Sequence, residues 1–155
     1  MKLGINEDGL LDIVIDNGVV EETTIKAALL ASLMLNRRAD PEDILPYGYQ
    51  GKEGALTDDR QGWVGDILDT KGRLVGSKLW QLDQELATQE TLQRARQYMR
   101  EAVQWSIDDG YVSKLEIEDE QPTPNRFNLN LSFFMINGER WQLRFDYETG
   151  ELYEL

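Results

Sequence analysis

Two runs of alternating apolar and polar residues near the C-terminus constrain the fold of this chain more than any other feature. Apolar residues occupy every second position from Phe127 to Met135 and again from Trp141 to Tyr147. Because successive strand side chains point to opposite faces, each run predicts a strand with one apolar face. Asn137-Gly138 between the runs is a strong hairpin signal. The rest of the chain must therefore cover the apolar face of a C-terminal β-hairpin.

The register of this hairpin can be predicted from its apolar faces. A two-residue Asn-Gly loop would pair residue 136 with 139 and set apolar residues opposite polar ones. One more loop residue aligns the apolar faces by pairing 135 with 141, 133 with 143 and 131 with 145. We therefore predict a three-residue loop over Asn137 to Glu139, with Gly138 in the left-handed region and a G1-type bulge.

The segment before the hairpin predicts the longest helix. Apolar residues recur every three or four positions from Leu92 to Ile107, which is the spacing of one helix face. Thr88 is placed as the N-cap residue, and Gly110 is placed as the glycine after the C-terminus. We therefore predict a helix over about 89–109.

A strand is predicted directly after this helix, over residues 111–118. It ends in an acidic run, 116–120, whose charges keep a strand edge soluble. Pro122 and Pro124 are expected to break the strand, because proline cannot donate to the ladder.

A second helix is predicted over about 24–37, capped by Thr23 or Thr24. Its apolar residues lie nearly all round, so we expect it to be mostly buried. Arg37 and Arg38 are expected at its C-terminal end, where cations complement the helix dipole. Before this helix, a β-branched run over 10–15 and the turn signal Asn17-Gly18 predict a short strand or hairpin.

These elements predict an α+β fold, with two main helices packed on a small, mostly antiparallel sheet that contains the C-terminal β-hairpin. The N-terminal strand either joins this sheet or extends as an arm, and the sequence leaves both open. The chain has 155 residues, of which 41% are hydrophobic, and this is the size and balance of one soluble domain. We therefore expect a single domain over 1–155.

Charge and missing residue types exclude several classes of function. Asp and Glu number 29 against 16 Lys and Arg, giving a net charge of −13, which repels phosphate backbones and anionic lipid heads. Cys and His are absent, which excludes disulfides, zinc–thiolate sites and histidine-based catalysis. We expect no cofactor, no metal, no nucleic-acid partner and no membrane partner. The chain begins without a signal-peptide pattern, so we expect a soluble protein made in a cytoplasm.

Residues 39–79 form the least regular third of the sequence. Long irregular segments within compact domains are either functional or disordered. This one contains Tyr47, Tyr49 and Trp63, with Trp80 just past its end. Because aromatic residues favour packing, we predict an ordered aromatic loop rather than a flexible linker.

Within this loop, Trp63 lies between Gly62 and Gly65. One interpretation is that the loop inserts into a partner protein with Trp63 as the anchor, since tryptophan is enriched at interface hot spots. The other is that Trp63 covers one end of the core while the glycines permit a tight path. The residues alone leave both open.

The paired charges have structural and functional interpretations. Arg37 and Arg38 either cap a helix and pair with local acids, or form a docking point for an acidic partner. Acids stand close together at Asp58-Asp59, at Asp66 with Asp69, and at Asp108-Asp109. They could serve as acid/base pairs or Mg²⁺ ligands, but solvated charges and turn caps are the simpler interpretation. For Asp108-Asp109 we favour a turn, paired with a nearby arginine.

Four strings of the sequence, in this order, resemble the signatures of one phage protein family. They span residues 29–40, 59–66, 76–82 and 88–110. The family is the Mu-like phage baseplate protein encoded by gene forty-six, and the resemblance covers roughly residues 7–150. It departs from the family pattern at Gln61, where a further arginine often stands, and at Val64, where a second tryptophan often stands. An interface made by this loop would therefore have a smaller aromatic anchor and one charge fewer.

The resemblance implies a structural subunit of the tail baseplate in contractile-tailed phages, similar in role to the small wedge protein of T-even phages. It implies a place in the virion, packing against the larger wedge proteins, sixfold repetition and no catalysis. The residues that we expect at the partner interface are Arg37, Arg38, Arg60, Trp63, Asp66 and Trp80.

Two alternatives stay open. One is a peptidoglycan hydrolase that uses two carboxylates about 5–9.5 Å apart, drawn from Asp59, Asp66 and Glu85. The other is a tail-assembly adaptor that is absent from finished particles.

Overall fold

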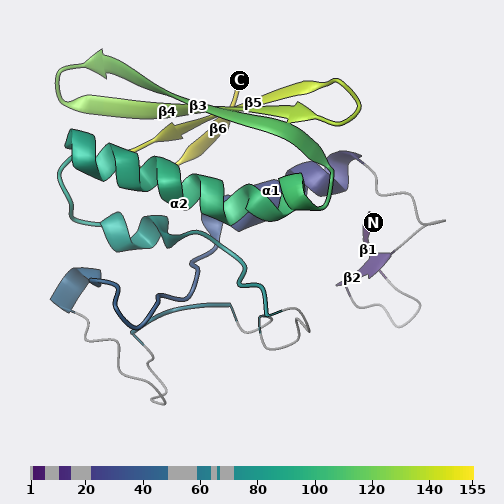
Figure 1. Cartoon of the computed structure of the whole chain (residues 1–155), viewed down its shortest axis with the longest axis horizontal. Coiled ribbons are helices and arrows are strands. Elements are labelled where there is room, and N and C mark those ends of the chain that lie inside the picture. The colour runs from purple at the N-terminus through teal and green to yellow at the C-terminus, as the bar shows by residue number, and fades with distance from the viewer. Residues whose placement is uncertain (1, 6–10, 15–21, 49–58, 64–65, 67–71) are drawn as a thin grey trace.

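The computed structural model describes residues 2–5, 11–14, 22–48, 59–63, 66 and 72–155. Two helices lie on one face of a four-stranded antiparallel sheet (Figure 1), which confirms the predicted α+β fold. The helices are α1 (Glu22–Met34) and α2 (Gln89–Asp108). The sheet contains, in spatial order, β3 (Val112–Thr123), β4 (Arg126–Met135), β5 (Arg140–Asp146) and β6 (Leu152–Glu154).

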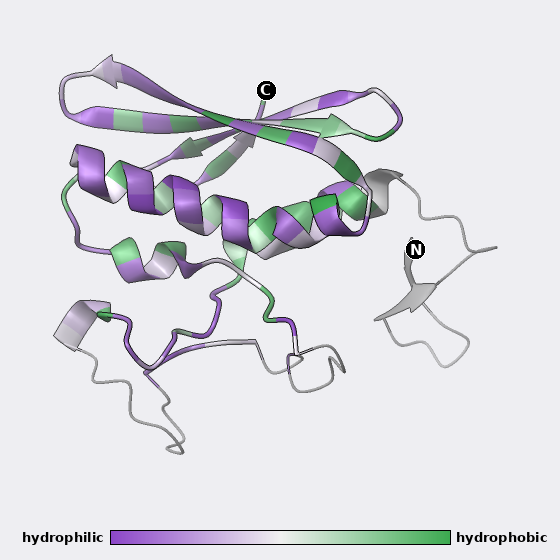
Figure 2. Ribbon diagram, viewed as in Figure 1, coloured by the Kyte–Doolittle hydropathy of each residue, from purple (hydrophilic) through white to green (hydrophobic). Residues whose placement is uncertain are grey.

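One hydrophobic core joins the helices to the sheet. Hydrophobic and hydrophilic residues alternate along α2 and along the strands of the sheet (Figure 2). The apolar face predicted for the hairpin is buried from Leu129 to Met135 and from Trp141 to Phe145. The rings of Phe133 and Trp141 are 5.5 Å apart between centroids. The indole Nε1 of Trp105 in α2 donates to Ser32 Oγ in α1 at 2.9 Å, which links the two helices.

The hairpin prediction was right in face and loop length but wrong in register. Phe133 pairs with Trp141 and Leu131 with Leu143, two positions away from the predicted partners. The loop has three residues, 136–138, and Gly138 occupies its third position with φ +92°. A type I turn followed by a left-handed residue needs glycine at that third position. A shift of two keeps every side chain on its face, so the apolar pattern fits both registers.

Helix α2 begins and ends as predicted. The hydroxyl Oγ1 of Thr88 accepts the Thr91 N–H at 3.2 Å. At the other end Gly110 has φ +80°, and the Tyr111 N–H donates to Ser106 O at 2.9 Å. This pattern is a Schellman motif, which satisfies the last carbonyls of the helix.

Strand β3 continues past the point where it was predicted to break. It includes Pro122 and ends at Thr123, and its register shifts between Glu120 and Thr123. Because β3 lies at the edge of the sheet, this irregularity accommodates a residue without an N–H.

Helix α1 differs from the prediction at both ends. It begins at Glu22, so neither Thr23 nor Thr24 can be its N-cap, and it ends at Met34. Arg37 and Arg38 therefore lie beyond its last turn. The helix is also less buried than expected, because Ala31 and Met34 are exposed.

The N-terminal strand pairs outside the main sheet. Strand β2 (Leu11–Val14) pairs antiparallel with β1 (Lys2–Ile5) in a two-stranded sheet of their own. The predicted turn at Asn17-Gly18 lies outside the described residues. No helix among the described parts of the chain is long and apolar enough to cross a bilayer.

Candidate interaction surface of the connecting segment

The segment between the two helices, residues 35–88, carries most of the candidate site residues, and we call it the connecting segment. Its described parts include the short 3₁₀ helices η1 (Pro46–Gly48) and η3 (Lys78–Leu82). Hydrogen bonds tie these parts to α1 and to one another. Tyr49, one of the aromatic residues of the predicted ordered loop, lies outside the described residues.

Ser77 fixes the connecting segment to the end of α1. Its N–H donates to Leu35 O at 2.9 Å, and its carbonyl accepts the Arg37 N–H at 3.0 Å. Its hydroxyl donates to Leu33 O at 2.8 Å, which satisfies a carbonyl of the last helical turn. Asn36 and Ser77 thus form a parallel β-bridge, and this bridge explains why α1 ends before Arg37.

Gly76 permits this approach. A Cβ placed on Gly76 would stand 2.5 Å from the carbonyl oxygen of Leu35 and 2.8 Å from the nitrogen of Arg37. Both atoms belong to the backbone, which cannot move without breaking the bridge. The φ of Gly76 is +102°, a value that favours glycine.

The described residues 59–63 of the second family-like string pack against the same region. The Ala39 N–H donates to Arg60 O at 2.9 Å, and Arg38 Nη1 donates to Gln61 O at 3.1 Å. A Cβ on Gly62 would stand 3.0 Å from Arg38 Cβ. The first of the four strings that resemble the family, 29–40, therefore contacts both the second and the third in the fold.

A buried lysine holds the segment near η3. Lys78 Nζ lies 2.6 Å from Asp40 Oδ2 and 2.8 Å from Asp43 Oδ2, and Gln81 Nε2 donates to Asp43 at 2.9 Å. Burial alone would raise the pKa of Asp43, but the hydrogen bonds from Lys78, Gln81 and the Asp40 N–H together lower it. The two carboxylates in turn raise the pKa of Lys78 despite its burial. Lys78 and Asp43 are therefore both charged at neutral pH.

The six predicted interface residues do not share one environment. Trp80 and Arg60 are 7% and 6% exposed, and the indole of Trp80 donates to Arg37 O at 2.8 Å. These two side chains are packed within the fold and are not available to a partner in this structure. Asp66 Oδ1 accepts the Val75 N–H at 2.9 Å and so fixes the loop. Trp63 is 47% exposed.

Sequence reasoning missed an apolar surface on the connecting segment and the end of α1. Its large side chains, with their exposed fractions, are Met34 (66%), Leu35 (37%), Ile44 (85%), Tyr47 (54%) and Leu86 (82%). Only the unbroken apolar run at the end of α1 could have signalled it, and that run was interpreted as core. Together with Trp63, these residues place large apolar side chains in water along a segment that is internally bonded.

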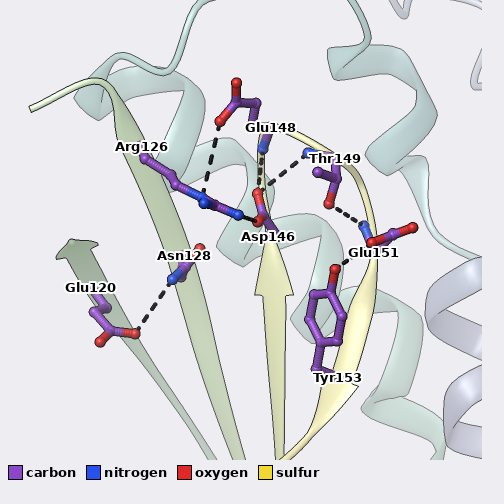
Figure 3. Close-up of polar contacts among 8 residues, drawn as sticks. All are labelled: Glu120, Arg126, Asn128, Asp146, Glu148, Thr149, Glu151 and Tyr153. Atoms are coloured by element: carbon purple, nitrogen blue, oxygen red, sulfur yellow. Dashed lines mark hydrogen bonds and ion pairs between the residues drawn. The ribbon is translucent and has the colours of Figure 1, made fainter. Parts of the chain in front are cut away.

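A groove of about 630 Å³ is lined by residues of the connecting segment and of the sheet. Met34 of α1 and Tyr47 and Leu86 of the connecting segment line it, together with Phe145 of β5 and Leu152 of β6. The turn between β5 and β6 forms part of the groove wall and is fixed by Asp146, which is shown in Figure 3.

Asp146 is 3% exposed and ties this turn together (Figure 3). It accepts the N–H groups of Glu148 and Thr149 at 2.9 and 3.3 Å and pairs with the guanidinium of Arg126. Burial would raise the pKa of Asp146, but these hydrogen bonds and the charge of Arg126 lower it overall. The wall of the groove is therefore held by a charged carboxylate.

The carboxylates considered for catalysis have structural partners. Glu85 is held by Arg94 at 2.8 Å, and Asp66 by the backbone of Val75. Asp109 pairs with Arg73 at 3.2 Å, which confirms the predicted turn with a nearby arginine. Among the residues that the structure describes, no three acids stand together as a metal-binding group.

The fold and this site define a small α+β protein whose candidate site is an exposed surface with a shallow groove. The family profile described as "Phage protein GP46" matches residues 25–140, most of the chain. The chain therefore belongs to this family, the Mu-like phage baseplate proteins that the four strings resemble.

Two relatives agree with this assignment. The chain is similar to "Baseplate protein gp46" of Escherichia phage Mu, with 39% identity over 117 residues, which is 76% of this chain and 69% of that protein. It is also similar to "Mu-like prophage FluMu protein gp46" of Haemophilus influenzae, with 31% identity over 85 residues, which is 55% of this chain and 62% of that protein.

Proposed function

We propose that this chain is a structural subunit of a phage tail baseplate, a wedge component of a contractile tail that acts by packing against other proteins. Its main partner is the large wedge protein, and the subunit repeats six times around the tail axis in the virion. Membership of the GP46 family and the baseplate role named for the Mu relative support this role.

The observation that carries the proposal is the apolar surface of the connecting segment. Exposed apolar residues scattered singly are normal, but a group of large ones marks an interaction surface. Met34, Tyr47 and Leu86 form such a group, because all three are exposed and line one groove. Here the Ser77 bridge and the Lys78 cluster fix the described residues around the groove, so a partner would meet a preformed surface. Preformed surfaces lose less entropy on binding and are typical of assembly subunits.

Replacing Trp63 with alanine tests this surface. Because Trp63 is 47% exposed, its removal deletes few buried contacts. We therefore expect a melting temperature within a few degrees of that of the wild type. Association with the co-expressed large wedge protein is expected to weaken about tenfold or more, as for a hot-spot tryptophan. The measurement is the fraction of partner in the complex peak, followed by light scattering, beside a circular-dichroism melt.

Tyr153→Ala is the matched control. Tyr153 is an aromatic residue with a similar exposed fraction, 45%, but it lies on β6. We expect this variant to associate as the wild type does. A fall of many degrees in the melting temperature of Trp63→Ala would instead show that Trp63 belongs to the core, and the loop would lose its role as anchor.

A further inference from the structure

A second groove, of about 600 Å³, lies on the solvent side of α2 next to the connecting segment. It runs from Gln93 to Gln104, which is about 16 Å at the rise of an α-helix. We call it the guanidinium groove, and its lining residues are Arg37, Gln93, Arg96, Gln97, Arg100, Glu101 and Gln104.

The charges of this groove are unusual for a chain with a net charge of −13. Elsewhere the lysine and arginine side chains that the structure describes from Lys26 onward each have an ion pair, a hydrogen bond or another polar or ring contact, as Arg96 has with Asp119. Among these side chains, those of Arg37 and Arg100 alone have none. Both line the guanidinium groove. The many carboxylates of this protein leave these two guanidiniums unpaired. A partner could therefore supply the carboxylates that pair with them.

Several other polar side chains of the groove already have hydrogen-bond partners within the protein. Gln97 donates to Glu101 and Gln104 to Asp108, each at 2.9 Å and one helical turn away. Arg96 donates hydrogen bonds from two of its nitrogens, Nε and Nη2, to the carboxylate of Asp119. These contacts hold the groove wall in place and leave the forks of Arg37 and Arg100 as the open donors. A guanidinium fork matches a carboxylate through two parallel hydrogen bonds.

We propose that the guanidinium groove binds an acidic segment of a neighbouring baseplate protein, with carboxylates pairing to Arg37 and Arg100. The proposal rests on the proposed function and adds a second contact area, distinct from the apolar surface around Trp63. A short acidic segment suits the groove better than a nucleic acid does. The 29 acids of the chain repel a long polyanion at a distance, whereas a segment attached to a protein needs only local complementarity.

The test compares charge reversals in the complex with the co-expressed large wedge protein. Arg37→Glu with Arg100→Glu is expected to weaken association at least tenfold, and the remaining association is expected to depend less on salt. The control, Lys114→Glu with Arg140→Glu, changes the net charge equally at two exposed cations on the sheet, outside both the groove and the connecting segment. It is expected to associate as the wild type does, and a thermal melt of each variant checks folding.

The outcomes separate the two proposals. Equal association of both double variants and the wild type would overturn the groove proposal and leave the proposed function in place. No association of the wild type would count against the proposed function itself. Self-association of the isolated wild type that the Arg37/Arg100 variant loses would assign the groove to a second copy and overturn the proposal. Retention of the wild type on duplex DNA that the variant loses would overturn it in the same way.

Discussion

Replacing Gly76 with alanine is expected to lower the free energy of unfolding by about 3–5 kcal/mol, because the change adds both crowding and backbone strain. The new Cβ would meet the carbonyl oxygen of Leu35 at 2.5 Å. Relief of this contact must open the bridge between Asn36 and Ser77, which ends α1 and positions the connecting segment. The measurement is a urea titration followed by circular dichroism.

Gly72→Ala separates crowding from strain. Gly72 also has a positive φ, +67°, but nothing lies within 4 Å of a Cβ built on it. We expect it to cost only about 1–2 kcal/mol, the penalty of a left-handed residue. Equal losses for Gly76→Ala and Gly72→Ala would mean that the close approach at Leu35 does not matter to stability.

Replacing Phe133 with alanine is expected to cost about 3–5 kcal/mol, the range for removing a buried phenylalanine. Phe133 is fully buried near the C-terminal end of β4 and packs on the ring of Trp141. The resulting cavity would lie in the core between the hairpin and the helices, where the helices pack on the sheet. The same denaturant titration measures it.

Phe134→Ala is the control for this change. Phe134 is the next residue along β4, so it points to the opposite face of the sheet, where it is half-buried beside Lys114 and Arg140. We expect the free energy of unfolding to fall by about 1 kcal/mol, because the variant buries less apolar area and loses cation–π contacts. Similar losses for the two phenylalanines would contradict the assignment of the apolar face.

The fold could be predicted from the sequence where local patterns decide it. The alternation over 127–147 identified the buried face, and Thr88 and Gly110 marked the ends of α2. The hairpin register could not be read from the same pattern, because a shift of two preserves the face. The end of α1 at Met34 depends on a bridge to Ser77, which is far away in the sequence.

The candidate site was less predictable, because exposure of an irregular segment is decided by its tertiary contacts. Trp63 and Trp80 look alike in sequence, yet one is half-exposed and the other is buried over the backbone of Arg37. The pairing of Lys78 with Asp40 and Asp43 spans nearly forty residues and leaves no local signal. The second and third family-like strings both contact the first one, and these contacts between distant parts of the sequence leave no local signal.

The central claim, that the protein is a structural part of the baseplate, is tested most directly by quantitative mass spectrometry of purified, finished phage particles. The proposed function expects the subunit in the particles, at a copy number that is a multiple of six. Its absence from finished particles, together with its presence in assembly intermediates, would contradict that claim and indicate an assembly adaptor instead.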